Sequence, residues 1–148
     1  MNLYFLDTSA LVKLYVQEAG TDRLLRLVGA STETRLALLS LSVVEVRSAI
    51  RRRQRTGDID QDAADFVLGA LQKHLESRYL RKSINDTLID TALDAVDRYA
   101  LPAYDAMQLA GCLVLCASER RSWTFVCSDQ QLLEAARSAD LSVLDPTA

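Results

Sequence analysis

The chain has 148 residues, the size of one ordinary domain, and 49% of them are hydrophobic, enough for a sizeable core. Its net charge of −3 provides no overall basic field for nucleic acid, so any such binding needs local patches. No apolar run approaches the roughly 18 residues that span a bilayer, and the N-terminus lacks the basic leader of a signal peptide. We therefore expect one soluble, cytoplasmic domain over residues 1–148, with no membrane partner.

Apolar periodicity predicts strands that alternate with helices. Leu3–Leu6 is a short apolar run that ends on Asp7, after which the spacing becomes helical. The predicted strands cover 3–6, 36–39, 79–84, 123–127 and 141–144. Seven helices are predicted. The first begins after residue 7, the second covers 24–28, the third runs from 42 to about 55 and the fourth begins at 60. The fifth begins at 85–87, the sixth runs from about 103 to 118 and the seventh from 130 to about 138. This alternation indicates an α/β fold of three layers, with a central parallel sheet of about five strands.

Two helices have features that are open to test. Ser42 and Glu45 have the spacing of a capping box, which would begin a helix at Ser42. In the helix after residue 85, the residues expected to face inward are Leu88, Ile89, Ala92, Val96 and Tyr99. The acids of that helix also follow helical spacing and are expected to form a solvated face: Asp86, Asp90, Asp94 and Asp97.

Four acidic residues lie at sequence positions that a parallel sheet would bring close together in space. Asp7 and Asp129 follow predicted strands, and Glu45 lies early in the helix after another strand. Because all parallel strands end at one edge of the sheet, these three acids converge by topology. Asp105 joins them if its helix starts at the same edge.

Each of the four acids, taken alone, has an ordinary structural explanation, since carboxylates cap helices and complement the helix dipole. Together they would repel one another unless a cation neutralised them. Oxygen ligands suit Mg²⁺ or Mn²⁺, and the single histidine, His74, makes a zinc site improbable. The three cysteines, with Cys112 and Cys116 in one apolar helix, fit a core better than a redox pair.

A Mg²⁺ ion bound by carboxylates indicates phosphodiester hydrolysis as the function, because such an ion lowers the pKa of bound water and stabilises a leaving oxygen. There is no glycine-rich phosphate loop. Arg52 comes seven residues after Glu45, so it faces the same side of its helix and is a candidate contact for a substrate phosphate.

These residues resemble the motifs of PIN-domain ribonucleases, and in size the chain resembles the VapC-type toxins of toxin–antitoxin pairs. The four segments that resemble the family, in the family's order, are Leu6–Leu11, Ser42–Val46, Leu101–Ala106 and Phe125–Leu132.

By this resemblance, Asp7, Glu45, Asp105 and Asp129 form the catalytic acidic quartet that binds Mg²⁺ or Mn²⁺, and Ser9 supports the first acid. The family often has Thr or Ser two residues before the last acid, where this chain has Cys127; whether Ser128 replaces that hydroxyl is open. The resemblance also implies an RNA substrate, a homodimer, and an antitoxin protein whose C-terminal segment covers the active site.

Three alternatives remain for comparison. A phospho-acceptor signalling domain would have adjacent acids after its first strand and a late lysine, but Asp7 stands alone and no lysine follows Lys82. A phosphatase of the Asp-x-Asp kind would need an acid where Ser9 lies. The third alternative is a catalytically inactive or very slow PIN-like module that binds RNA or protein. Metal-dependent cleavage would distinguish it from a nuclease.

Overall fold

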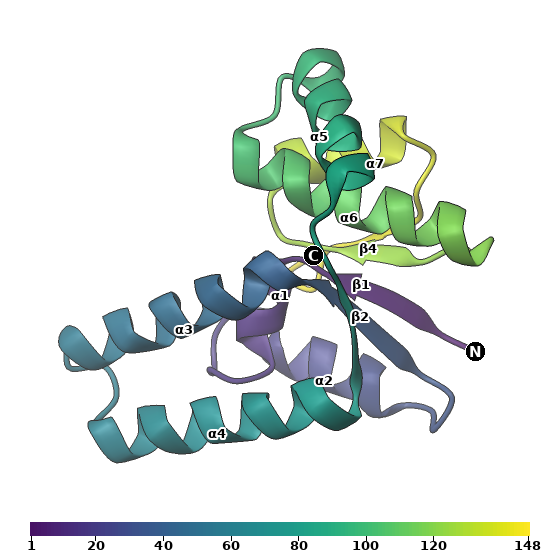
Figure 1. Ribbon diagram of the computed structural model, residues 1–148. Helices are drawn as coiled ribbons and strands as arrows, with labels where there is room; N and C mark the ends of the chain where they lie inside the picture. Colours follow the sequence, from purple (N-terminus) through teal and green to yellow (C-terminus); the bar gives the residue numbers. More distant parts are fainter.

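The computed structural model describes all residues from 1 to 148 and has three layers, with a parallel sheet between two groups of helices (Figure 1). The five strands lie in the order β3-β2-β1-β4-β5, and every neighbouring pair is parallel. The strands are β1 (Leu3–Leu6), β2 (Arg35–Leu39), β3 (Tyr79–Lys82), β4 (Thr124–Val126) and β5 (Val143–Leu144). The helices are α1 (Thr8–Lys13), α2 (Thr21–Gly29), α3 (Ser40–Arg55), α4 (Gln61–Ser77), α5 (Asp86–Tyr99), α6 (Ala103–Glu119) and α7 (Gln130–Ser138). The predicted fold class is confirmed.

The sheet is buried on both faces, which explains the continuous apolar runs of its strands. Phe5 and Phe125 stack with ring centroids 6.1 Å apart in a core shared with α5, α6 and α7. Leu6 and Val126, the next residues along the same strands, belong to a second core with α1 to α4. Because helices cover both faces, the carboxyl edge of the strands is the place where a site can open.

The start of α3 differs from the prediction. The helix begins at Ser40, and the residue before it, Leu39, makes no side-chain capping bond. Ser42 is buried, and its hydroxyl bonds to side chains of other helices. The capping-box interpretation of Ser42 and Glu45 is therefore wrong, because tertiary contacts have taken the hydroxyl that would have capped the backbone.

The inward face of α5 also differs in part. Leu88, Ala92 and Ala95 are buried, whereas Ile89 and Val96 are exposed. The small Ala95 thus lies inward in place of the larger Val96, and Tyr99 is half-buried. The acids of α5 are exposed as expected. No single helix of the protein is long and apolar enough to cross a membrane, and only the pair α5 and α6, bent by 119°, meets the length and composition criteria together.

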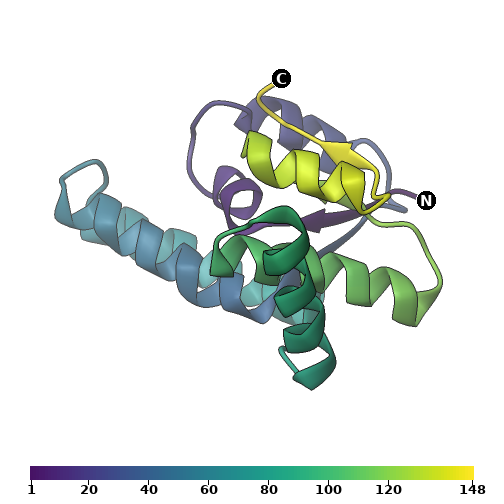
Figure 2. The ribbon, with the colours of Figure 1, turned by 90° about the horizontal axis from the view of Figure 1, so that it is seen from above.

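Helices α3 and α4 run side by side and extend beyond the sheet (Figures 1 and 2). Arg51 of α3 pairs with Asp65 of α4 at 3.0 Å, and Arg53 pairs with Glu18 at 2.8 Å. Two of the arginines of α3 are therefore held by acids of the protein, whereas Arg52 has no such partner and is exposed.

Candidate active site

The four predicted acids line one pocket of about 440 Å³ at the carboxyl edge of the sheet. Eight of its nine lining residues are polar, and none is Lys, Arg or His. The nine residues are Asp7, Thr8, Ser9, Glu45, Tyr104, Asp105, Gln108, Ser128 and Asp129. The topological argument for convergence is thus confirmed, and Asp105 joins because α6 starts at this edge.

Asp7 stands between β1 and α1 and is only 6% exposed. Its Oδ1 accepts hydrogen bonds from the backbone N–H of Ala10 at 2.9 Å, which caps α1, and from Ser9 Oγ at 2.7 Å. Its Oδ2 accepts no hydrogen bond from the protein. Burial raises the pKa of Asp7 from 3.8 to about 7; the bonds from Ser9 and Ala10 lower it, and the charges of Asp105 and Glu45 raise it further. An uncompensated negative charge at this position is therefore costly.

Glu45 is held by hydrogen bonds from two other helices. Its Oε1 accepts from Thr8 Oγ1 at 2.6 Å and from Gln108 Nε2 at 3.4 Å. Thr8 Oγ1 also lies 2.9 Å from Ser42 Oγ. The resulting polar cluster joins α1, α3 and α6 along one wall of the pocket.

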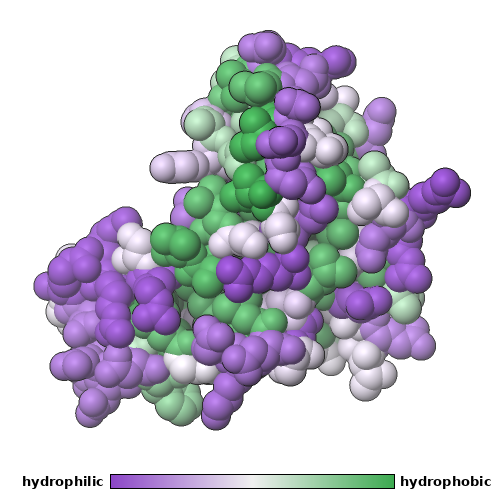
Figure 3. All heavy atoms as spheres, viewed as in Figure 1, coloured by the Kyte–Doolittle hydropathy of each residue, from purple (hydrophilic) through white to green (hydrophobic).

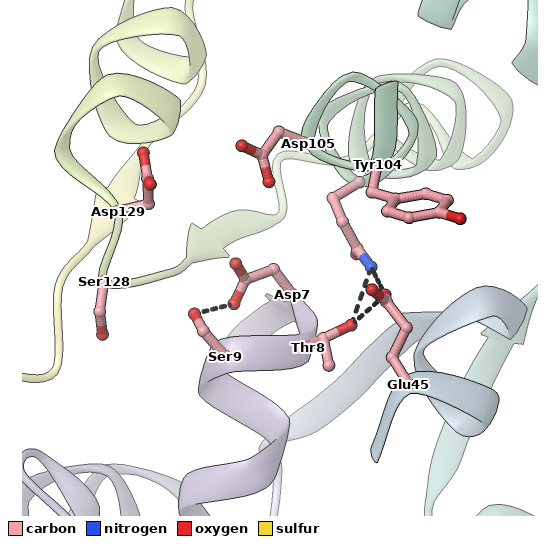
Figure 4. A pocket seen from close by; sticks show the side chains of 9 residues that line it. Asp7, Thr8, Ser9, Glu45, Tyr104, Asp105, Ser128 and Asp129 are labelled. Atoms are coloured by element: carbon pink, nitrogen blue, oxygen red, sulfur yellow. Dashed lines mark hydrogen bonds between the residues drawn. The ribbon is translucent and has the colours of Figure 1, made fainter. Parts of the chain in front are cut away.

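Asp105 and Asp129 lie on the far side of the pocket from Glu45 (Figure 4). Asp129 caps α7, with Oδ1 accepting from the backbone N–H of Leu132 at 2.9 Å. Asp105, in the first turn of α6, accepts no hydrogen bond from the protein. The pKa of Asp105 is raised above its ordinary value, mainly by burial and to a smaller extent by the negative charges of Asp129 and Glu45.

The other predicted residues have different surroundings. Ser9 Oγ donates to Asp7 Oδ1, and its supporting role in the site stays a prediction. Ser128 lines the pocket, but its buried Oγ bonds to no acid, so its replacement of the missing hydroxyl stays a prediction. Cys127 donates its Sγ proton to the backbone oxygen of Asp129 at 3.7 Å. Arg52 does not line the pocket, since it lies about two helical turns along α3 from Glu45.

Sequence reasoning missed Thr8, Tyr104 and Gln108. Thr8 and Tyr104 are next to predicted acids in the chain, which was an available signal. Gln108 follows Asp105 by three residues, which places both on one face of α6. That spacing could have identified Gln108 as a pocket residue, although not its partners on α1 and α3.

The chemistry of the pocket suits a divalent cation. Each of Asp7, Glu45 and Asp129 uses one carboxylate oxygen within the protein and leaves the other without a partner. Oxygen donors of this kind fit Mg²⁺ or Mn²⁺, and no cationic side chain in the lining offsets their charge. No three Asp, Glu, His or Cys side chains of the protein lie close enough together to form a ready-made metal-binding group.

A family comparison matches residues 4–138 to the PIN domain. The chain belongs to the PIN domain family. A sequence comparison with curated proteins finds no significant match.

Several solved structures share this PIN fold. PAE2754 from Pyrobaculum aerophilum is 21% identical, with a TM-score of 0.64 over 98% of this chain and 90% of that one. A toxin–antitoxin complex from Klebsiella pneumoniae is 13% identical, with a TM-score of 0.63 over 97% of each chain. VapBC2 from Rickettsia felis, bound to a DNA fragment from its promoter, is also 13% identical, with a TM-score of 0.62 over 96% and 97%. At these identities the likeness concerns the fold.

Proposed function

We propose that this PIN-domain chain is a Mg²⁺- or Mn²⁺-dependent endoribonuclease and the toxin of a toxin–antitoxin pair of the VapC type. The observation that supports this most is the single pocket lined by Asp7, Glu45, Asp105 and Asp129 without a neighbouring cation. Similar folds occur in toxin–antitoxin complexes from other organisms, which is consistent with the toxin assignment.

In this proposal the four carboxylates have two different roles in metal binding. Asp7, Asp105 and Glu45 offer oxygens directly to the ion, and Asp129 acts through water or a second ion. The bound ion would lower the pKa of the attacking water and stabilise the leaving oxygen of the phosphodiester. The protein contributes a fixed acid at Asp7, where Ser9 and Ala10 hold Oδ1, and an exposed Arg52 that could contact a flanking phosphate.

The proposed partners follow from the charge and shape of the surface. The acidic pocket would attract a basic side chain of an antitoxin segment that covers it. A homodimer is also expected, because α5 exposes Ile89, Leu93 and Val96 at spacings of four and three residues. Figure 3 shows hydrophobic side chains gathered over α5, and an exposed apolar stripe of this kind is typical of a protein contact.

Cleavage of RNA tests the proposal. Antitoxin-free protein is incubated with a pool of cellular RNA in Mg²⁺, in Mn²⁺ and with chelator, beside Asp7→Asn and Asp105→Asn. We expect discrete fragments from the parent only with metal, and a rate at least 100-fold lower in each variant, because a metal ligand is lost.

The same assay separates the nuclease from a binding module. Metal binding by calorimetry without cleavage of any RNA would favour the catalytically inactive PIN-like module. A variant that cuts at the parent rate would remove that carboxylate from the reaction. Absence of metal binding would contradict the assignment of the four acids.

A further inference from the structure

Gln108 is a buried polar residue at the back of the pocket, only 3% exposed. Glutamine is rarely buried to this extent unless its amide is bonded. The position is one helical turn after Asp105 on α6, so its side chain points toward the same edge of the sheet.

The amide nitrogen of Gln108 reaches side chains of two other helices. Nε2 lies 2.9 Å from Ser42 Oγ, 3.1 Å from Thr8 Oγ1 and 3.4 Å from Glu45 Oε1. Thr8 Oγ1 in turn donates to the same Glu45 oxygen at 2.6 Å. Because Nε2 carries two hydrogens, its two shorter contacts, with Ser42 and Thr8, are its main bonds, and its 3.4 Å contact with Glu45 is weaker. Thr8 therefore holds Glu45 Oε1 directly, Gln108 supports it mainly through Thr8, and Oε2 is left as the only unbonded oxygen of Glu45.

The amide oxygen of Gln108 has no partner although it is buried. Burial of an unpaired amide oxygen is unfavourable, and an apolar side chain of similar size would avoid it. The presence of a glutamine here is thus better explained by what its nitrogen does for Glu45 than by stability alone.

We propose that Gln108 is a positioning residue that, with Thr8, fixes Glu45 so that a single carboxylate oxygen is presented to the metal ion. This inference rests on the proposed function, because it assumes that Glu45 is a metal ligand. Partners that hold a metal ligand typically change metal affinity by about 10- to 100-fold when removed.

The test is a calorimetric titration with Mn²⁺ alone, without RNA, of the parent, Gln108→Met, Glu45→Gln and the double variant. Methionine keeps the length of the side chain and removes its donors. We expect Gln108→Met to raise the Kd for Mn²⁺ about tenfold. In the Glu45→Gln background the same substitution should have little further effect, because Gln108 acts through Glu45.

Two further variants complete the design. Thr8→Val removes the other donor to Glu45 Oε1 with little change of shape, and it should weaken Mn²⁺ binding in the same non-additive way. Gln72→Met is the matched control, since Gln72 is exposed on α4 and bonds only to Glu76, and it should bind as the parent does. Thermal unfolding checks that each variant is folded.

The outcomes separate the two proposals. Unchanged affinity in both Gln108→Met and Thr8→Val would overturn the positioning role while the metal site stands. The positioning role would also be overturned if Gln108→Met lowered the Mn²⁺ affinity equally in the parent and in the Glu45→Gln background. Gln108 would then affect metal binding by a route that does not involve Glu45. If the parent binds no Mn²⁺ at all, the metal-dependent function itself fails.

Discussion

At the scale of single residues, two of the pocket carboxylates use one oxygen to cap a helix and keep the other oxygen unbonded. Asp7 and Asp129 each cap a helix with Oδ1, and Oδ2 stays without a protein partner. In the sequence, capping and metal binding look like competing explanations of the same acid. In the structure both are compatible, because a cap requires only one of the two oxygens.

The burial of Asp7 predicts a stability that depends on pH. Its pKa is about 7 in the folded protein and 3.8 for an ordinary aspartate, as in the unfolded chain, so between these values the folded state holds a proton that the unfolded chain has released. Its contribution to the free energy of unfolding therefore falls as the pH rises from about 4 to about 7, by up to about 4 kcal/mol. Asp7→Asn keeps the acceptor for Ser9 and Ala10 but does not titrate, so it should be more stable than the parent above pH 7.

Urea unfolding in chelator at pH 4, 5, 6, 7 and 8 measures this difference. The two proteins should be close at pH 4 and should diverge as the pH rises, with the variant favoured. If the free energies of unfolding of the two proteins differed by the same amount at every pH, the charge of Asp7 would not destabilise the folded state. Exposed Asp90→Asn on α5 is the control, since its carboxylate is solvated.

The residue scale is also where sequence reasoning reached its limit. Asp7, Glu45, Asp105 and Asp129 could be placed at one edge because strand ends and helix starts are visible in the pattern. Ser42 could not be assigned correctly, since its spacing to Glu45 fits a capping box equally well. Its real partners, Thr8 and Gln108, become neighbours only when α1, α3 and α6 meet.

At the scale of elements, α6 approaches the sheet closely because it has a glycine where it crosses β1 and β2. A Cβ at Gly111 would lie 2.9 Å from Phe5 Cζ and 3.3 Å from Leu39 Cδ1. Alanine gains up to about 1 kcal/mol of helix propensity over glycine. Overpacking a core typically costs about 1–3 kcal/mol. Gly111→Ala should therefore destabilise the protein, as measured by the midpoint of urea unfolding.

Gly69→Ala is the matched control for this substitution. Gly69 is exposed in the middle of α4, and a Cβ there meets nothing within 4 Å. Alanine should stabilise the protein by roughly 0.5–1 kcal/mol at this position. If Gly111→Ala were also stabilising, the close approach of α6 to Phe5 would be wrong.

The rotation of α5 shows why an element can be predicted while its inward face is not. Hydrophobic periodicity favours the large side chains, Ile89 and Val96, for the core. The helix instead places Ala95 inward, beside the correctly predicted Ala92, and α5 packs against α6. Small residues allow two helix backbones to approach, an advantage that hydrophobicity alone does not reveal.

At the scale of the whole molecule, the alternation of strands and helices was enough to predict a parallel sheet with its strand ends at one edge. The order of the strands in the sheet and the position of Asp105 could not be predicted from this alternation. Asp105 follows α5 and a short break instead of a strand, so no topological rule places it. Packing of α6 across β1 and β2 brings its first turn to the pocket.

The exposed stripe on α5 leads to a prediction about assembly. Leu93 is 59% exposed and lies between Ile89 and Val96, so a charge there would be buried unpaired in any contact made through this stripe. If the protein is the expected homodimer through α5, Leu93→Glu should shift its mass in solution from dimer to monomer. Light scattering after size-exclusion chromatography measures that mass.

Phe66→Glu is the control for the same experiment, because Phe66 is 78% exposed on α4, which packs in the other core of the protein from α5. It adds the same charge to another exposed apolar position and should leave the dimer intact. A parent that is already monomeric would contradict the homodimer, and loss of the dimer only in Phe66→Glu would move the contact to the α3–α4 hairpin. Since no residue of the pocket lies on the exposed stripe of α5, Leu93→Glu should also retain Mn²⁺ binding, which separates a defect of assembly from a defect of the site.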